Sequence, residues 1–329
     1  MSRTTDDPTP ALSQAVRLGV LDVGSNTAHL QVVDVYPGGS PAPLHSVKAQ
    51  IGLSEDIDRH GVISPDGLDR LVQAVRECVA EAEAYGVAEL VPFGTSSVRD
   101  APNRIEACTR IRRATGVDMS FFSGEAEAGL TFLAARRWYG WQSGRMLMLD
   151  IGGGTVELAI GRGEEPELAV SLPLGAWRLT RRYLSQDPPT AQEIKKLRRR
   201  LREVLAPTIA AFREQPEPQL VVAVSKIFTQ LAKLTAVPEA EGPLVLEYRE
   251  LRRWIPKLAR MTTAERAALP GISLARARTI VAGAVLARIL LELLDVPRVE
   301  ICPWGLREGI LLRHLDDSST APANGEGGE

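Results

Sequence analysis

The chain has 329 residues, of which 44% are hydrophobic and 24% are charged, and its net charge is −2. A chain of this length and composition can bury a substantial core, and we expect an ordinary folded protein of two domains. The near-neutral charge excludes the broad basic surface that is typical of nucleic-acid-binding proteins, so no nucleic-acid partner is predicted.

Cysteine usage and hydropathy exclude further classes. Cys78, Cys108 and Cys302 lie far apart and lack C-x-x-C spacing, so neither a disulfide framework nor a zinc site is predicted. The N-terminus has no apolar signal region, and no stretch reaches the roughly 18 uncharged apolar residues of a membrane span. We expect a cytoplasmic protein that does not associate with membranes. Segments 1–15 and 316–329, rich in small polar and acidic residues, are predicted to be disordered.

The first predicted element is a β-hairpin within residues 19–35, GVLDVGSNTAHLQVVDV. Its polar break is too long for a two-residue Asn-Gly turn. Small residues let a loop turn tightly with its N–H groups pointing inward, which makes a cradle for phosphate oxygens. An Asp at the strand end can hold a magnesium ion, directly or through water. The candidate residues are Asp22 for the metal and Gly24, Ser25, Asn26 and Thr27 for phosphate.

The next candidate segment is LVPFGTSSVRDAPNR, in which an apolar run leads into a hydroxyl-rich turn and then a predicted helix. This pattern also fits a simple strand-to-helix turn in which Asp100 or Asn103 caps the helix. Arg99 favours phosphate binding, because a guanidinium beside a hydroxyl-rich turn suits bidentate contacts. The candidate phosphate contacts are Thr95, Ser96 and Arg99.

Residues 121–141, FFSGEAEAGLTFLAARRWYGW, predict a helix that is capped by Ser123 and runs through about Trp138. Glu125 lies in the first turn, where the helix dipole favours an acid. Glu127 stands one residue too far from Ser123 for a capping box and lies at the head of an apolar stripe. A carboxylate there points toward the interior or a cleft, where it suits a general base. The helix pattern alone leaves a structural role for Glu127 equally open.

Residues 146–163, MLMLDIGGGTVELAIGRG, repeat the first hairpin, with Asp150 matching Asp22 at an offset of 128 residues. A duplicated strand–turn–strand pattern suggests two similar domains. The loop is not of the Rossmann or P-loop type, since those require a helix directly after the glycines. Two such loops in register favour a phosphate site. The candidates are Asp150 for the metal and Gly152, Gly153, Gly154 and Thr155 for phosphate.

The stretch from Arg178 to Arg202 is rich in cations. In IKKLRRRLREVL the apolar residues fall at helical spacing, so most of these charges are predicted to form a solvated helix face. An electrostatic guide for a long polyanion remains the alternative. Three later segments predict a buried strand leading to a helix (VVAVSKIF), a long buried helix (ARARTIVAGAVLARILLELL) and a closing helix over residues 305–315.

Together, LGVLDVGSNTAHL, FGTSSVRDAPN, FFSGEAEAGL, LDIGGGTVEL and CPWGLREGILLRHL resemble the exopolyphosphatase and guanosine pentaphosphate phosphohydrolase family, within the actin, sugar kinase and Hsp70 fold group. The resemblance runs from Leu18 to Leu315 and implies two actin-like, ribonuclease H-like α/β domains with an interdomain cleft. It places the first domain at residues 16–138 and the second at 139–315, with the closing helix near the first domain. The short chain is similar to the actinobacterial exopolyphosphatases, which the resemblance links to short polyphosphate chains.

The resemblance implies a Mg²⁺-dependent hydrolase that removes orthophosphate from the end of a phosphoanhydride chain. Glu127 matches the catalytic base of the family, and Asp22 and Asp150 match its metal-site carboxylates. Glu157 corresponds to an acid that supports the water or the metal, whereas its mate in the first repeat is His29. The implied phosphate contacts are Gly24 to Thr27, Gly152 to Thr155, Thr95, Ser96 and Arg99.

Two departures from the family pattern bear on the substrate. Ala126 replaces the first acid of the usual pair at the helix start, and Ser225-Lys226 replaces a small pair near the expected nucleotide pocket. Lys226 would crowd a purine base but would neutralise a distal phosphate of a chain. This favours inorganic polyphosphate as the substrate, with guanosine pentaphosphate (pppGpp) and ATP as alternatives.

Other functions remain open at this point. A non-catalytic sensor that binds these anions fits the same loops. Fold analogy also allows a sugar kinase, which the missing glycine pair and the position of Glu127 disfavour. A homodimer is the default expectation because two-fold dimers are the commonest assemblies.

Overall fold

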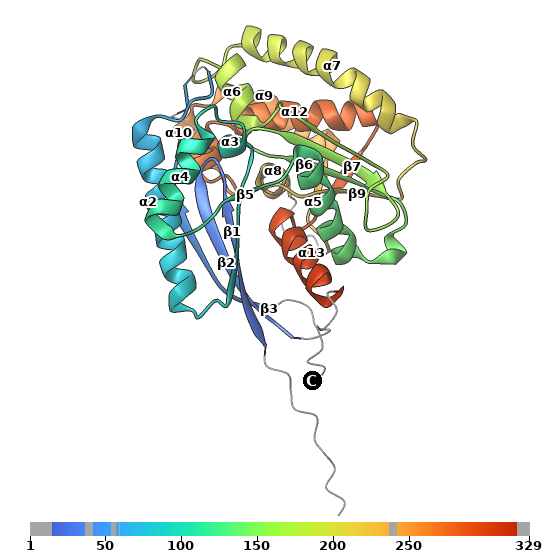
Figure 1. The fold of residues 1–329 in the computed structure, drawn as a ribbon. Helices are drawn as coiled ribbons and strands as arrows, with labels where there is room; N and C mark the ends of the chain where they lie inside the picture. The colour runs from blue at the N-terminus through green and yellow to red at the C-terminus, as the bar shows by residue number, and fades with distance from the viewer. Residues whose placement is uncertain (1–14, 37–41, 54–56, 59, 237–241, 321–329) are drawn as a thin grey trace, which may run out of the picture. The chain divides into compact units, whose positions relative to one another are not determined.

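A computed structural model describes residues 15–36, 42–53, 57–58, 60–236 and 242–320 (Figure 1). The chain folds into two compact units. The first contains residues up to Gly94 and Pro102–Ser120, and the second contains Thr95–Ala101 and the residues from Phe121 onward. The sequence placed the boundary after residue 138. The division instead precedes the helix Gly124–Tyr139, because that helix packs on strands of the second unit.

The first unit is built on a sheet with the strand order β3-β2-β1-β4-β5. β2 is antiparallel to β1 and β3, and β4 is parallel to β1. The helices are α2 (Pro65–Ala84), which packs on the sheet, and α4 (Arg104–Thr115), which packs on α2. The strands are β1 (Val16–Val23), β2 (Thr27–Val35), β3 (Ala42–Gln50), β4 (Glu89–Gly94) and β5 (Ser120–Phe121).

Local sequence explains where the helices of this unit start. Ser64 accepts a hydrogen bond from the N–H of Gly67 at 3.1 Å, and proline at the first helical position suits the start of α2. Asn103 occupies the N-cap position of α4 but does not cap it. Its amide pairs instead with the backbone of Ile63, at 3.0 Å to the N–H and 2.9 Å to the carbonyl.

The second unit contains a sheet with the order β10-β11-β9-β6-β7-β8. β7 is antiparallel to β6 and β8, and β9 is parallel to β6. Both units therefore share one topology, an antiparallel meander of three strands followed by a parallel strand beside the first of them, which confirms the predicted repeat. The strands are β6 (Met146–Ile151), β7 (Val156–Gly161), β8 (Leu168–Leu172), β9 (Leu220–Ala223), β10 (Val245–Glu247) and β11 (Arg298–Ile301).

Helices surround this second sheet. α12 is apolar on nearly all sides and is buried, and α7 runs along it (Figure 1). The helices are α3 (Ser96–Arg99), α5 (Gly124–Tyr139), α6 (Ala176–Tyr183), α7 (Ala191–Arg213), α8 (Lys226–Thr235), α9 (Tyr248–Arg260), α10 (Thr263–Ala267), α11 (Leu274–Ala277), α12 (Ile280–Leu294) and α13 (Leu306–Thr320), with a 3₁₀ turn at Trp141–Ser143.

Most predicted elements are confirmed. β9 followed by α8 is the predicted strand and helix, and the predicted buried helix is α12, which the short α11 precedes. The closing helix is α13, which packs on α5 (Figure 1). α13 continues to Thr320, so residues 316–320 are helical, unlike the predicted disordered tail. Residues 1–14 and 321–329 of the predicted disordered ends lie outside the described residues.

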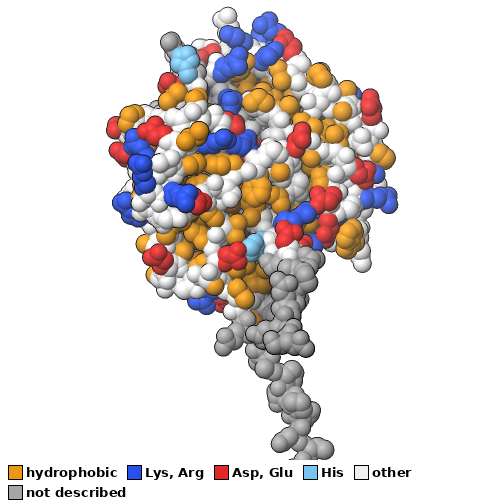
Figure 2. All heavy atoms as spheres, viewed as in Figure 1, with side chains coloured by type: hydrophobic (Ala, Val, Ile, Leu, Met, Phe, Trp, Pro, Cys, Tyr) orange, Lys and Arg blue, Asp and Glu red, His pale blue; other side chains and the backbone are white. Residues whose placement is uncertain are grey.

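The basic stretch forms the predicted amphipathic helix. Leu197 and Leu201 on α7 are buried, whereas Lys196 and Arg200 are exposed. Figure 2 shows Lys and Arg side chains gathered along the top of the view, in the region of α6 and the start of α7.

Two observations on the described part of the chain concern membrane-spanning helices and cysteines. None of its helices is both long and apolar enough to cross a bilayer. Its three cysteines, Cys78, Cys108 and Cys302, are free thiols.

Candidate active site

The two predicted loops have the same backbone structure. In the first unit the N–H of Gly24 donates to the carbonyl of Thr27 at 3.0 Å, and in the second unit Gly152 donates to Thr155 at 2.9 Å. The flanking strands share their register as well, since Asp22 lies opposite His29 and Asp150 lies opposite Glu157. The repeat in the sequence therefore corresponds to the same backbone hydrogen-bond pattern in both hairpins.

Residues 152–155 are held by two neighbouring elements of the second unit. The N–H groups of Gly175 and Ala176, at the start of α6, donate to the carbonyls of Gly154 and Gly152 at 3.0 and 2.9 Å. A Cβ on Gly175 would lie 2.2 Å from the carbonyl oxygen of Gly153, and a Cβ on Gly154 would lie 2.4 Å from Oγ of Ser96. Gly175 is therefore required by close packing on the backbone of the loop, and at Gly154 the side chain of Ser96 lies against the loop.

Arg99 and Glu127 form an ion pair beside this loop. Nη1 of Arg99 donates to Oε1 of Glu127 at 2.5 Å and to the carbonyl of Phe122 at 3.0 Å. Glu127 is only 6% exposed, so it does not face bulk solvent. Burial of a carboxylate is costly unless it is paired, and Arg99 supplies that partner.

Asp100 links Arg99 to a second arginine. It accepts a hydrogen bond from Nε of Arg99 at 2.9 Å, and its other oxygen lies 3.7 Å from Nη2 of Arg178. Nε of Arg178 in turn donates to the carbonyl of Gly154 at 3.1 Å. Two guanidinium groups thus flank the loop, each close to a carboxylate, and both carry donors that suit phosphate oxygens.

A cavity of about 430 Å³ opens among these elements of the second unit. It contains the start of α5, where an α-helix leaves its first N–H groups without partners inside the helix and favours an anion. Ser123 caps this helix as predicted, by accepting from the N–H of Ala126 at 3.1 Å. The lining residues are Arg99, Asp100, Ser123, Gly124, Glu125, Thr155, Ser171, Leu172 and Pro173.

Glu157 is buried next to this cavity, close to the carboxylate of Asp150. Ser171 on β8 donates to its Oε1 at 2.8 Å. Burial raises the pKa of Glu157 above its ordinary value, the charge of Asp150 raises this pKa further, and hydrogen bonds from Thr155 and Ser171 oppose the rise. Two carboxylates on adjacent strands therefore repel each other.

This repulsion fits a divalent cation, which would relieve it. No three His, Cys, Asp or Glu side chains of the described residues cluster into a complete metal cage. Mg²⁺ does not need one, because it binds through one or two carboxylates together with water and substrate phosphates. Asp150 with Glu157 is consistent with such a site.

Lys226 begins α8 and is exposed. The adjacent Ser225 accepts a hydrogen bond from the N–H of Ile151 at 3.2 Å, and Val224 donates to Leu149 at 3.0 Å. The start of α8 is therefore attached to the end of β6, where Asp150 and the Gly152 loop lie.

The structure does not bring all predicted residues into one described group. Ser96, Arg99, Glu127, Thr155 and Glu157 meet in the second unit. Thr95 stands at the N-cap position of α3, although its side chain does not cap that helix. Gly152, Gly153 and Gly154 form the loop itself, and Lys226 lies near its base.

Asp22 and the first loop belong to the other unit. The carbonyls of Asn26 and Ser25 accept hydrogen bonds from Ile51 and Leu53 at 2.8 and 2.7 Å, which fixes this loop within its own unit. Gly24 and Thr27 close its turn.

Sequence reasoning missed several residues of the site. Gly124 leaves no room for a side chain, since a Cβ there would lie 2.4 Å from Cβ of Ser171. Gly175 holds the second loop, and Arg276, on α11, is close enough for the charge of Asp150 to oppose the lowering of its pKa by burial. Gly124 lies inside a quoted motif, but Ser171 and Arg276 carry no local signal because long-range packing brings them to the site.

Comparison with known proteins gives consistent matches along the chain. The model of the Ppx/GppA phosphatase family matches residues 32–318. Exopolyphosphatase 1 of Mycobacterium tuberculosis is 49% identical over 312 residues, which cover 94% of this chain and 91% of that protein. A more distant relative is the guanosine-5'-triphosphate,3'-diphosphate pyrophosphatase of Vibrio cholerae, 24% identical over 93% of this chain and 61% of that protein.

A solved structure resembles the fold over nearly its whole length. The crystal structure of an exopolyphosphatase from Cytophaga hutchinsonii superimposes with a TM-score of 0.83 and 27% identity, covering 92% of this chain and 98% of that one. The predicted pair of actin-like α/β domains is thus confirmed as the fold class.

Proposed function

Because the chain belongs to the Ppx/GppA phosphatase family, we propose that it is an exopolyphosphatase that releases orthophosphate from the ends of inorganic polyphosphate. The observation that carries this proposal is the Arg99–Glu127 ion pair at a cavity that contains both Thr155 of the phosphate loop and the start of α5. An anion-binding surface and a held carboxylate lie together there, as hydrolysis of a phosphoanhydride requires.

The terminal phosphate is bound mainly by backbone and charge. In this proposal the terminal phosphate lies in the cavity beside Thr155 at the end of the second loop and beside the first N–H groups of α5, with Arg99 as a cation in the cavity wall. Phosphoryl transfer needs little covalent chemistry from a protein, since it is catalysed by positioning and by stabilising charge on the phosphate oxygens. The first loop, Gly24 to Thr27, is proposed to bind phosphate within its own unit by the same kind of donors.

Glu127 orients the attacking water. Its ion pair with Arg99 fixes one carboxylate oxygen, so the group has a set orientation when it accepts a hydrogen bond from water. Arg99 contributes twice in this arrangement, because it positions Glu127 and faces the phosphate cavity.

The chain carries residues suited to a metal. Asp150 is the carboxylate of the second unit that would hold Mg²⁺, with Glu157 in support, and Asp22 is proposed as the metal-binding carboxylate of the first unit. Bound Mg²⁺ would neutralise charge on the phosphate oxygens.

Inorganic polyphosphate is the preferred substrate in this proposal. Lys226 adds a cation at the start of α8. We propose that its side chain would crowd a purine base. The Vibrio cholerae relative, named for a guanosine nucleotide substrate, keeps pppGpp as the second candidate.

Lys226→Gly is expected to raise turnover of pppGpp or ATP by about tenfold, and Lys226→Ala tests whether the lost charge alone matters. No gain in either variant contradicts the crowding argument.

The test of function is a panel of phosphate-release assays. Purified protein with Mg²⁺ is given tripolyphosphate, long-chain polyphosphate, pppGpp and ATP at equal concentrations of chain ends, and each assay is repeated with EDTA. We expect orthophosphate release from polyphosphate above the nucleotides, and loss of release with EDTA. Faster release from pppGpp would select the second candidate, and binding without release from any substrate would identify a sensor.

The proposed compartment is the cytoplasm. Its reducing conditions keep Cys78, Cys108 and Cys302 as the thiols that the structure contains.

A further inference from the structure

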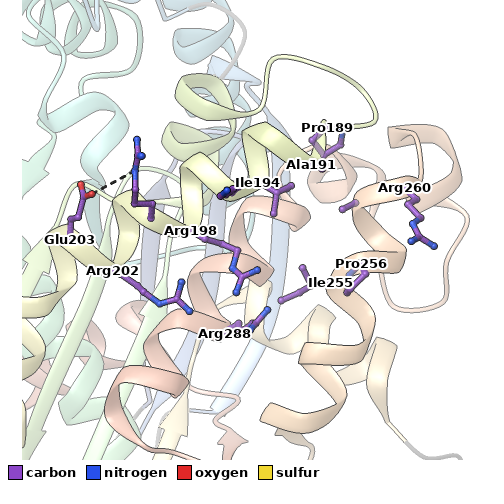
Figure 3. Close-up of a pocket in the computed structure, with 13 residues that line it drawn as sticks. Pro189, Ala191, Ile194, Arg198, Arg202, Glu203, Ile255, Pro256, Arg260 and Arg288 are labelled. Atoms are coloured by element: carbon purple, nitrogen blue, oxygen red, sulfur yellow. Dashed lines mark ion pairs between the residues drawn. The ribbon is translucent and has the colours of Figure 1, made fainter.

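A second cavity, larger than the first, lies between α7, α9 and α12 of the second unit (Figure 3). Its volume is about 890 Å³, within the range of pockets that hold small organic ligands. It shares no lining residue with the cavity at Arg99. The lining residues are Pro189, Ala191, Ile194, Lys195, Arg198, Arg199, Arg202, Glu203, Ile255, Pro256, Ala259, Arg260 and Arg288.

Three arginines point into this cavity, and two of them contact the same carboxylate. Figure 3 shows Arg198, Arg202 and Arg288 directed into the same space from α7 and α12. Nη2 of Arg202 donates to Oε1 of Glu292 at 2.7 Å, and Nε of Arg288 lies 3.7 Å from Oε2 of the same residue. The other nearby acid, Glu203, is exposed and lies 3.7 Å from Arg199 at the rim. The cluster thus keeps an excess of positive charge.

One donor of this cluster is buried without an acceptor. Nε of Arg198 is inaccessible to solvent and makes no hydrogen bond within the described residues, whereas Nε of Arg288, also without a hydrogen bond, has the carboxylate of Glu292 near it. Burial lowers the pKa of Arg198, and the charges of Arg288 and Arg202 lower it further. A buried donor without an acceptor and repelling cations are costly, so a multivalent anion at this point would stabilise the structure.

The rest of the cavity is apolar. Ile194 on α7 lies across the cavity from Ile255 and Pro256 on α9 (Figure 3), and Ala259 also lines it. An inorganic phosphate chain would satisfy the guanidinium groups but would leave these apolar side chains in water. A ligand that uses both parts has phosphates at one end and a flat apolar group at the other.

We propose that this cavity binds a nucleoside di- or triphosphate, with its phosphates on Arg198, Arg202 and Arg288 and its base against Ile255 and Pro256. Guanidinium groups suit phosphate oxygens because their donors match them in pairs. The site lies outside the catalytic machinery described above, and the proposal does not depend on the substrate of the enzyme.

The location is tested on the unmodified protein by photolabelling with 8-azidoadenosine 5′-(β,γ-imido)triphosphate, which resists hydrolysis. Labelled peptides identified by mass spectrometry are expected to come from residues 189–203 or 255–260. Label confined to the peptides around Asp150 or Lys226 would place the nucleotide in the active site and overturn the proposal. Because this measurement uses the intact chain, it does not depend on any variant folding.

Affinity is tested with a fluorescent N-methylanthraniloyl derivative of the same nucleotide. Arg198→Gln and Arg288→Gln are each expected to weaken binding about tenfold or more, whereas the matched control Arg200→Gln, exposed on the same helix, stays within about twofold. Unchanged binding in both cavity variants overturns the proposal.

The ligand class is tested by competition for the photolabelled site. Unlabelled nucleoside triphosphate should prevent labelling of residues 189–203 at a concentration at least about tenfold below that of tripolyphosphate, because only the nucleotide covers the apolar wall. Equal competition by tripolyphosphate would show that the cavity takes an inorganic chain and contradict the nucleotide assignment.

Discussion

The two hairpins of this protein have the same backbone and different chemistry. β1 and β2 place Asp22 opposite His29, and β6 and β7 place Asp150 opposite Glu157. A serine from the third strand bonds the second side chain in each case: Nε2 of His29 lies 2.7 Å from Oγ of Ser46, and Ser171 donates to Glu157 at 2.8 Å. His29 is partly exposed, whereas Glu157 is 5% exposed.

Their surroundings differ as well. The second loop packs against Ser96 and the start of α6, and the Arg99–Glu127 pair lies beside it. The first loop is tied to residues 51–53 by backbone hydrogen bonds. Duplication thus explains the shared backbone of the two loops, which we propose binds phosphate. The added acids are the reason why the second copy is expected to control hydrolysis.

The largest expected effect comes from the acid beside the second hairpin. Glu127→Gln removes the carboxylate that is proposed to orient water but keeps the size of the side chain, so kcat should fall by roughly 10²- to 10⁴-fold with KM within a few-fold. Steady-state phosphate release measures both constants. The matched control is Glu125→Gln on the same helix, which should retain near-normal kcat. Retained turnover in Glu127→Gln removes Glu127 from its role.

The next largest effect is expected from disrupting the contact that holds the second loop. Gly175→Ala places a Cβ 2.2 Å from the backbone oxygen of Gly153, which no side-chain rotation relieves. We expect a loss of about 3 kcal/mol in the free energy of unfolding, measured by urea denaturation, and reduced activity. Gly129→Ala is the control, since its Cβ meets nothing within 4 Å and should not destabilise the helix. Equal stability of the two variants would show that the loop tolerates movement of α6.

Ser171 and Ser46, which contact Glu157 and His29, allow a direct comparison of the two hairpins. Ser171→Ala removes a hydrogen bond to buried Glu157 and should lower kcat by about tenfold, because the carboxylate loses its orientation. Ser46→Ala removes the equivalent contact of His29 and should change kcat by less than about twofold. Parallel losses in the two variants would mean that both hairpins contribute alike to the chemistry.

The smallest effect is on stability, at α7, which packs on α6 behind the second loop. Glu193 accepts four hydrogen bonds from Thr190 and Ser185, and despite the opposing effect of burial these lower its pKa to about 2. A lowered pKa stabilises the fold above the ordinary value near 4.5, and that stability is lost as the pH falls toward 2.

Glu193→Gln should therefore cost about 1 kcal/mol at pH 7, with the difference from the unmodified protein shrinking below about pH 4.5. Urea denaturation across this pH range measures it, and kcat should stay unchanged. Glu214→Gln at the other end of α7 is the control. A difference that grows on acidification has the wrong sign and contradicts the assignment.

Much of the fold was predictable because its signals are local. The alternating strands, the small-residue loops and the cap at Ser123 are encoded within about ten residues each. The offset of 128 residues between Asp22 and Asp150 also predicted that His29 and Glu157 occupy equivalent positions in the two hairpins.

The remainder depends on packing between distant segments. Ser171 reaches Glu157 only because β8 pairs with β7, and Gly175 meets the loop only after β8 turns into α6. The contacts of α5, and not its sequence, likewise assign this helix to the second compact unit. The cavity between α7, α9 and α12 could not be predicted either, because Arg198 and Arg288 lie far apart in the sequence and line one cavity only in the folded chain.

The most direct test of the asymmetry compares Glu157→Gln with His29→Gln in one assay of orthophosphate release from polyphosphate. Glu157→Gln is expected to lower kcat by about 100-fold, since it removes a buried acid next to Asp150, and His29→Gln should change kcat by less than about threefold. Circular dichroism confirms that both variants are folded. Equal loss of kcat in the two variants, or full activity of Glu157→Gln, would contradict the assignment of hydrolysis to the second hairpin.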